Sequence, residues 1–224
     1  MKLYSGPLSM FGAKAEIAAH EKGLDVELIM VPFEMKTLYE PKHPEVVRIN
    51  PKRQVPVLID GDLEIFDSTQ IFEHFEAVRP VPALWPSDPK ARASARLLEH
   101  KSDEVYFPPV VRLMGLQATP ADPAAVEARA SAGRFYDDME ASLVDKEWLA
   151  GSYSYADIAF YMAQIFGDRM GVPMTEAHPC LQAWRERVGA RPAVRRVAGA
   201  MGRYLLSQGR PIPAFLADVV AAAS

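Results

Sequence analysis

The sequence predicts two domains of different class, an α/β domain at the N-terminus and an all-α helical domain after it. Short apolar runs separated by a helical segment fill the first part of the chain. A stretch with four prolines follows, from Pro80 to Pro89, and every long segment after it has helical periodicity. Because proline stiffens an extended chain, we expect residues 80–90 to link a domain at 1–79 to a helical domain at 91–224.

The N-terminal segment begins with a strand, a helix and a second strand. Residues 2–5 form a short apolar run, residues 12–22 have small or apolar residues at helical spacing, and Gly23 is a typical helix stop. Residues 25–31 then tend toward alternation, which favours a strand. This order within about thirty residues indicates a crossover connection and therefore a parallel pair of strands.

A β-hairpin and a helix are predicted next, after a polar loop with a short helix over residues 32–50. Residues 55–59 and 63–66 are β-branched or apolar and flank Asp60-Gly61, a dipeptide that suits a tight turn. Asp67-Ser68 follow, and both residue types cap helices. Apolar residues at helical spacing come after them. The resulting order, βαβ-α-ββα, is that of the thioredoxin fold.

Pro56 is unusual inside a strand, because proline donates no ladder hydrogen bond. A cis bond before it would leave the N–H and C=O groups of Val55 free for an extended peptide ligand. The helix start at Ser68 offers N–H groups and a positive dipole end, which suit a carboxylate. Together these features indicate a pocket for a small, anionic, peptide-like molecule. An ordinary hairpin with an edge proline explains the same residues equally well.

The run Gln54-Val55-Pro56-Val57-Leu58, followed by Asp67-Ser68 at a helix start, resembles the glutathione-binding core of the soluble glutathione transferases. The resemblance implies a thioredoxin-like N-terminal domain, an all-helical C-terminal domain, a cis proline and glutathione as co-substrate. It also implies that Asp67 and Ser68 hold the γ-glutamyl end of glutathione. By position, Lys42 would meet the glycyl carboxylate, supported by Gln54.

Residues 6–14 are similar to the serine-type pattern of bacterial members of that family, which places Ser9 at the catalytic position and Lys14 at the usual basic position. Glu16 departs from the pattern, since a second basic residue is frequent there. In this role Ser9 donates a hydrogen bond to the glutathione thiolate and is not itself a nucleophile. The alternative for Ser9 is a helix cap, and Tyr4 and Ser5 are the other candidates for thiol activation.

The C-terminal half reads as a series of helices. One spans residues 90–116 but must kink or break at Pro108-Pro109. Asp122 starts another that runs to about residue 143, and further helices begin at residues 178–179 and 191–192. The pair Ser154 and Asp157 forms a capping-box-like signal before an apolar helix. Similar boxes are typical of the glutathione transferase family.

The electrophile site implied by the resemblance would lie between the two domains. Its candidates are chosen by location and apolarity, and aromatic residues at such spacing are more often part of a core. They are Phe11, Tyr106, Phe107 and Met114.

Composition excludes several other classes of function. The chain of 224 residues has a formal net charge of −4, which argues against nucleic acid or an anionic membrane as the main partner. It contains one cysteine, Cys180, so it has neither an intramolecular disulfide nor a multi-cysteine metal site, and no metal is expected. No secretory leader or membrane-length apolar run is evident, which predicts a cytoplasmic protein.

The sequence thus predicts a cytoplasmic glutathione transferase that activates glutathione for attack on a small hydrophobic electrophile, with a role in detoxification. By family analogy we expect a homodimer. Two other functions stay open. One is a specialised glutathione-dependent dehalogenase, isomerase or ether-cleaving enzyme. The other is a non-catalytic glutathione-binding or regulatory protein that keeps the fold.

Overall fold

The computed structural model describes residues 1–221 and divides into two compact units. The first unit consists of Met1–Ala83 together with the chain from Pro192 onward. The second unit consists of Leu84–Arg191. Among the described residues, no helix is long and apolar enough to cross a membrane.

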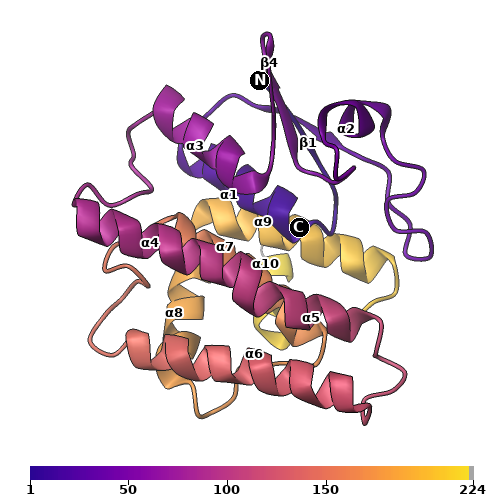
Figure 1. The fold of residues 1–224 in the computed structure, drawn as a ribbon, viewed down its shortest axis with the longest axis vertical. Helices are drawn as coiled ribbons and strands as arrows, with labels where there is room; N and C mark the ends of the chain where they lie inside the picture. The colour runs from indigo at the N-terminus through magenta and orange to yellow at the C-terminus, as the bar shows by residue number, and fades with distance from the viewer. Residues whose placement is uncertain (222–224) are drawn as a thin grey trace. The chain divides into compact units, whose positions relative to one another are not determined.

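A four-stranded sheet with the strand order β2-β1-β3-β4 forms the centre of the first unit (Figure 1). The strands are β1 (Lys2–Ser5), β2 (Glu27–Met30), β3 (Val57–Asp60) and β4 (Leu63–Phe66). β1 pairs with β2 in parallel, as the strand–helix–strand order predicts, and β3 pairs with β4 as the predicted hairpin. Asp60 pairs with Leu63, so the turn residues are Gly61 and Asp62 rather than Asp60 and Gly61. Gly61 has a φ of 63°, which a residue without Cβ adopts freely.

Helices cover both faces of this sheet. They are α1 (Met10–Glu21), α2 (Pro44–Ile49) and α3 (Ser68–Val78). Tyr4 and Val57 cluster with Val46 of α2 on one face. Side chains alternate along a strand, so Leu3 and Leu58 point to the other face, where α1 and α3 lie side by side (Figure 1). A parallel pair, an antiparallel hairpin and helices on both faces make this unit thioredoxin-like.

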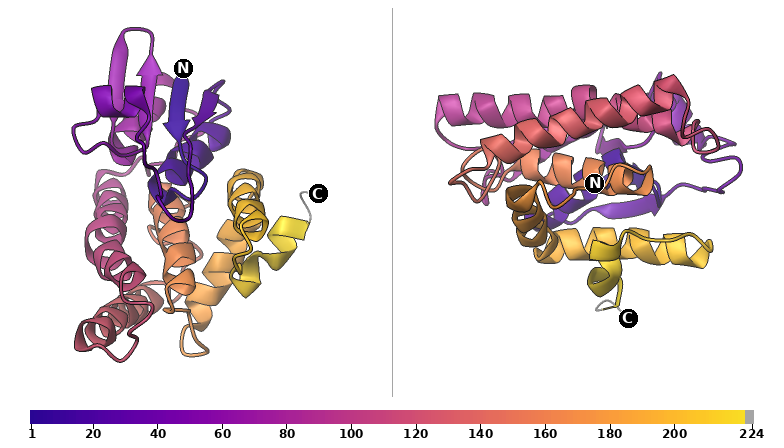
Figure 2. Two further views of the ribbon diagram at one scale, coloured as in Figure 1. Left: turned by 90° about the vertical axis from the view of Figure 1, so that its right-hand side faces the viewer. Right: turned by 90° about the horizontal axis from the view of Figure 1, so that it is seen from below.

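All regular structure of the second unit, described over residues 84–191, is helical. The elements are α4 (Pro89–Lys101), a π-helical turn (Ser102–Tyr106), α5 (Phe107–Met114), α6 (Pro123–Ser142), α7 (Tyr155–Arg169) and α8 (Pro179–Gly189). α7 is buried along nearly its whole length and packs against α4, α5 and α8. In Figure 2, α4 (magenta) and α7 (orange) run side by side.

Two local signals of the second unit are confirmed. Pro108 and Pro109 interrupt the long helix, because neither can donate to the preceding turn, and the backbone widens into the π-helical turn just before them. The capping box also forms. The N–H and hydroxyl groups of Ser154 donate to Asp157 Oδ2, at 2.8 and 3.1 Å.

The end of the chain packs differently from the expectation that residues 91–224 form one helical domain. Helix α9 (Pro192–Ser207) packs on α1 and belongs to the first unit, as does α10 (Ala217–Ala221). The Tyr204 hydroxyl on α9 donates to the Phe33 carbonyl oxygen at 3.0 Å. Residues 222–224 of the expected domain lie outside the described residues.

The proline-rich connector is anchored to the first unit at its start. The Lys22 side chain is buried, and its Nζ forms an ion pair with Glu76 at 2.6 Å. The same ammonium donates to the carbonyl oxygens of Arg79 and Pro82, at 2.8 and 2.9 Å. A buried charge held by three acceptors ties the connector to the end of α1.

Candidate functional site

The predicted glutathione-site segments of the first unit meet at one end of its sheet. At that end the register aligns Tyr4 of β1, Val57 of β3 and Phe66 of β4. β1 and β4 run toward this end, whereas β3 starts from it. The strands therefore bring together three segments that are distant in sequence, namely Ser9, Val55-Pro56 and Asp67-Ser68.

Ser9 caps α1 at this end. Its Oγ accepts the Gly12 N–H at 2.9 Å, and the residue as a whole is 8% exposed. Within the described part of the chain, the Ser9 hydroxyl proton has no acceptor. The capping role and the donor role considered from the sequence therefore use different parts of one hydroxyl, the oxygen lone pair and the proton.

The other candidates for thiol activation are engaged elsewhere. Tyr4 points to the opposite face of the sheet, where its ring lies 5.1 Å from the ring of His43. Ser5 is fully buried, and its hydroxyl donates to Glu16 Oε1. Of the three, Ser9 is the one that lies at the start of α1.

Glu16 is a buried carboxyl beneath the Ser9 turn. Burial raises the pKa of Glu16 to about 7, and the hydrogen bond from Ser5 offsets part of that effect. Gly12, one turn earlier in α1, has no room for a side chain, because a Cβ there would overlap Ser5 Oγ. Glu16 lies four residues after Gly12 and seven after Ser9. This helical spacing places all three residues on the same face of α1.

The Val55-Pro56 bond is cis, as the resemblance implies. Val55 precedes the first paired residue of β3, and among the described residues neither its N–H nor its C=O has a hydrogen-bond partner. The preceding loop is braced by Asn50, whose Nδ2 donates to the Gln54 carbonyl oxygen at 2.6 Å. The backbone of Val55 is therefore presented in a form that an extended peptide can pair with.

Asp67 and Ser68 lie at the start of α3 and divide the predicted roles. Asp67 is the cap, with a φ of 78° and a carboxylate that accepts the N–H groups of Thr69 and Gln70, at 3.0 and 3.3 Å. Ser68 is the first helical residue and is 3% exposed. Loss of the Ser68 side chain therefore does not remove the cap.

Lys42 lies in the loop that follows β2, near a tyrosine that the sequence did not single out. Its Nζ is 3.4 Å from Glu40 Oε1 and 5.9 Å from the centroid of the Tyr39 ring. Tyr39 packs so closely on Gly6 that a Cβ there would overlap its ring, and its hydroxyl lies beside the backbone of Leu8. Burial raises the pKa of Tyr39 far above its ordinary value.

The four candidates for the electrophile site are divided between the units. Phe11 belongs to the first unit, with Lys14 Nζ 5.2 Å from its ring centroid. Tyr106 has no exposed surface, and its hydroxyl is hydrogen-bonded to that of Tyr136 at 2.5 Å, so it serves the core of the second unit.

The other two candidates lie nearer the surface of the second unit. Phe107 stacks on Phe166 with a centroid separation of 5.4 Å, and Met114 is 46% exposed.

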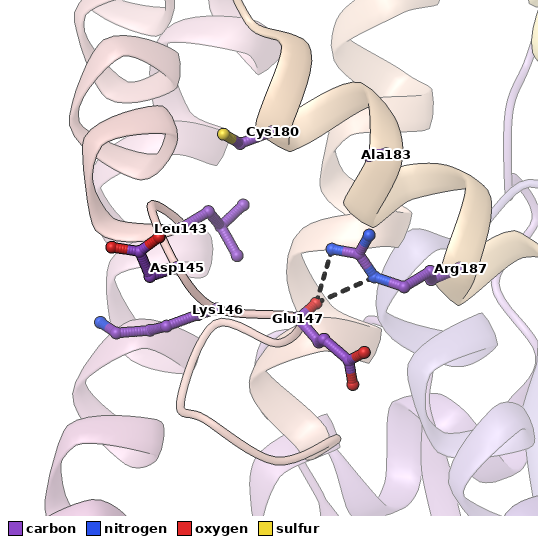
Figure 3. A pocket seen from close by; sticks show the side chains of 7 residues that line it. All are labelled: Leu143, Asp145, Lys146, Glu147, Cys180, Ala183 and Arg187. Carbon is purple, nitrogen blue, oxygen red and sulfur yellow. Dashed lines mark hydrogen bonds between the residues drawn. The ribbon is translucent and has the colours of Figure 1, made fainter.

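The second unit contains a cavity of about 330 Å³ beside Cys180 (Figure 3). The Arg187 guanidinium spans part of its wall and donates to the Glu147 carbonyl oxygen from Nε and Nη2, at 3.2 and 2.8 Å. A hydrogen bond to Glu140 is the main cause that raises the pKa of the Cys180 thiol, and partial burial is the second. A protonated thiol is a weak nucleophile, so this cavity is not a site of thiol chemistry. It is lined by Leu143, Asp145, Lys146, Glu147, Cys180, Ala183 and Arg187.

Among residues 1–221 there is no group of three or more His, Cys, Asp or Glu residues arranged to hold a metal ion.

The sequence matches known families over most of its length. Residues 1–77 match the model of the glutathione S-transferase N-terminal domain, and residues 104–192 match the model of the C-terminal domain. Glutathione S-transferase 3 of Zea mays is 30% identical over 212 residues, covering 90% of this chain and 94% of that protein. A shorter match, 33% identical over 109 residues and covering 48% of each chain, is to the stringent starvation protein A homolog of Coxiella burnetii.

Solved structures of glutathione transferases superpose on the chain. Glutathione transferase F7 from Populus trichocarpa has a TM-score of 0.73 and 26% identity, covering 89% of this chain and 98% of that one. A glutathione S-transferase from Rhodospirillum rubrum F11 has a TM-score of 0.74 and 28% identity, covering 88% and 91%. From its sequence matches and its fold, the chain belongs to the glutathione S-transferase family.

Proposed function

We propose that the protein is a glutathione transferase enzyme that activates the thiol of glutathione for attack on a small apolar electrophile. The observation that carries the proposal is the unpaired backbone of Val55 before the cis Pro56, at the same end of the sheet as Ser9. In this arrangement the cysteinyl part of glutathione pairs with Val55 and directs its sulfur toward Ser9.

The two ends of glutathione are assigned to charged and polar groups at the same end of the sheet. The γ-glutamyl carboxylate lies at the N-terminus of α3, where Ser68 and the helix dipole favour an anion. Asp67 lies near the γ-glutamyl ammonium group. Lys42 meets the glycyl carboxylate, and Gln54 supports it. Each charged end of glutathione thus meets a protein group of opposite charge, and this fixes the direction in which the ligand binds.

Activation of the thiol requires a pKa change of only one or two. A free thiol has a pKa of about 8.5, so a few per cent is ionised at pH 7. A hydroxyl hydrogen bond to a charged acceptor contributes roughly 1.5–3 kcal/mol, and a nearby helix N-terminus adds about 0.3–1 kcal/mol. Ser9 at the start of α1 supplies both effects, and the thiolate attacks the electrophile directly.

Two measurements test this function in order. Retention on immobilised glutathione, followed by calorimetric titration, shows whether the protein binds the tripeptide. Turnover of a generic aryl halide by the retained protein then distinguishes an enzyme from a binding protein. Loss of binding when glutathione is replaced by its S-methyl derivative points to contacts at the sulfur, whereas absence of any binding removes the proposal.

A non-catalytic role is the second candidate, because one relative matched over 48% of its length does not carry a transferase name. Glutathione binding without turnover of any electrophile supports it. The homodimer and the cytoplasmic role in detoxification belong to the main proposal, and light scattering of the purified protein tests the dimer.

A further inference from the structure

The carboxyl of Glu16 is buried in the first unit with a single hydrogen-bond partner among the described residues. That partner is Ser5, the last residue of β1. The neighbouring positions on α1, Ala15 and Ile17, are fully buried. An ionisable group at such a position costs stability that an apolar residue of similar size would not, and such groups are concentrated at functional sites.

Ser5 stands at the base of the turn that presents Ser9. The Ser5 carbonyl oxygen accepts the Val31 N–H at 2.8 Å, which fixes its backbone to the end of β2. The Ser9 N–H donates to the Gly6 carbonyl oxygen at 3.0 Å, which closes the turn directly after Ser5. A movement of Ser5 is therefore transmitted to Ser9 through three intervening residues.

Gly12 provides a second, through-space link between the two serines. A Cβ on Gly12 would overlap Ser5 Oγ and lie 3.2 Å from Ser9 Cβ, so the backbone of Gly12 fits between both side chains. Its N–H is the group that Ser9 Oγ accepts. Because Ser5 Oγ occupies the space where a Gly12 Cβ would stand, its position limits how closely Gly12, and with it the Ser9 cap, can approach β1.

We propose that Glu16 is a positioning residue for the transferase reaction, which holds Ser5 against Gly12 and thereby fixes the Ser9 hydroxyl where the glutathione sulfur binds. The inference rests on the proposed function. Glu16 acts through Ser5 and touches neither glutathione nor the electrophile. Its chemistry in this role is that of a hydrogen-bond acceptor, which an uncharged amide can also supply.

The test is ultraviolet titration of the glutathione thiolate bound to wild-type protein, Glu16→Leu and Glu16→Gln. In Glu16→Leu we expect the pKa of the bound thiol to rise by about one and kcat/KM at pH 7 to fall about tenfold. The Kd of glutathione should change less than about threefold, because its binding groups are untouched. Glu16→Gln keeps an acceptor for Ser5 and should stay within about twofold of wild type.

Glu76→Gln is the matched control, because Glu76 is another buried carboxylate of the first unit and is paired with Lys22 at 2.6 Å. It should lower the melting temperature and leave the thiol pKa unchanged. If Glu16→Leu does not fold, Ser5→Ala gives the same readout from the donor side.

The outcomes separate the two proposals. If the pKa of the bound glutathione thiol is lowered in wild type and equally low in Glu16→Leu and Ser5→Ala, the positioning role is overturned but the proposed function is not. A Glu16→Gln protein as impaired as Glu16→Leu overturns it too, because the acceptor is then not what matters. A wild-type complex whose thiol pKa equals that of free glutathione removes the proposed function, and the positioning role with it.

Discussion

Helices α1 and α8 both begin beside a hydroxyl or a thiol, but their N-terminal N–H groups are satisfied in different ways. At α1 the cap is the neutral Ser9 hydroxyl, and the first turn contains no acidic residue. At α8 a carboxylate from another helix takes that place. Glu140 of α6 accepts the N–H groups of Cys180 and Leu181, at 2.9 and 2.8 Å.

The difference shows why proximity to a helix N-terminus does not by itself activate a thiol. The positive end of a helix stabilises one nearby anion most strongly. At α8 that anion is Glu140. Burial alone would raise the pKa of Glu140, but the N–H groups of Leu181 and Cys180 outweigh it and lower the pKa, while the same carboxylate raises the pKa of Cys180. At α1 the cap is neutral and the first turn contains no acidic residue, so under the proposed function the anion at this helix end is the glutathione thiolate.

The largest expected effect concerns Glu16, a buried carboxyl in the second turn of α1, whose pKa shifts in the opposite direction from that of Glu140. Glu16 has a folded pKa of about 7 against an ordinary 4.5, so the folded state binds the extra proton between these values. The free energy of unfolding should therefore fall by up to about 3 kcal/mol as pH rises from about 4.5 to 7. Denaturant titrations across that range measure the fall, and Glu16→Gln should abolish it. Equal pH profiles for both proteins would contradict the burial of an ionisable Glu16.

Replacement of Ser9 with alanine tests the open helix start directly. Ser9→Ala should raise the pKa of bound glutathione by about one to two, so the rate at pH 7 should fall about ten- to a hundredfold. Much of the rate should return above the new pKa. Because Ser9 is also the cap, we expect a loss of about 1 kcal/mol in stability. Lower stability with an unchanged thiol pKa would leave Ser9 as a cap only.

The start of α3 extends the comparison to a third helix. Ser68→Ala should weaken glutathione binding roughly tenfold, since it removes a hydrogen bond to a carboxylate. Asp67 caps this helix, so the stability cost should be smaller than for Ser9→Ala. Calorimetric titration beside thermal melting measures both quantities. Unchanged affinity in a folded Ser68→Ala protein would remove this residue from the site.

The smallest effect is expected at the start of α8, where the Glu140 carboxylate raises the pKa of the Cys180 thiol. Glu140→Gln removes the negative charge next to Cys180, so the thiol pKa should fall. Its rate of reaction with a chromogenic disulfide at pH 7 should rise by about three- to tenfold. Cys180→Ser in the same background is the control and should abolish the reaction. If Cys180 in the Glu140→Gln protein reacts no faster than in wild type, burial and not Glu140 protects the thiol.

Local signals in the sequence predicted the helix starts and the sheet because each depends on neighbouring residues. Asp122 before Pro123 and Ser154 before Asp157 begin helices in the structure, and the hairpin around Gly61 forms one residue later than expected. The motif around Val55 and Pro56 carried the family assignment. Such features require a window of a few residues only.

Contacts between distant residues were not predictable in the same way. Glu140 lies forty residues before the α8 start that it caps, so no local pattern links the two. The sequence shows Glu16 only as a departure from the family pattern. Its burial was not predicted, because charged residues are rarely buried and its hydrogen-bond donor is Ser5 of β1. The position of the Tyr39 hydroxyl depends on the path of the loop after β2, and the sequence of that loop has no strong periodic pattern.

The packing of α9 on α1 has a consequence for biosynthesis on the ribosome. The first 83 residues emerge early, yet the helix that covers α1 is made only after Leu84–Arg191 has been translated. At about 5–20 residues per second, the interval is roughly 5 to 20 s. During that time the face of α1 on which α9 packs has no α9 to cover it, and the first unit of the nascent chain is completed last although its sheet is encoded first.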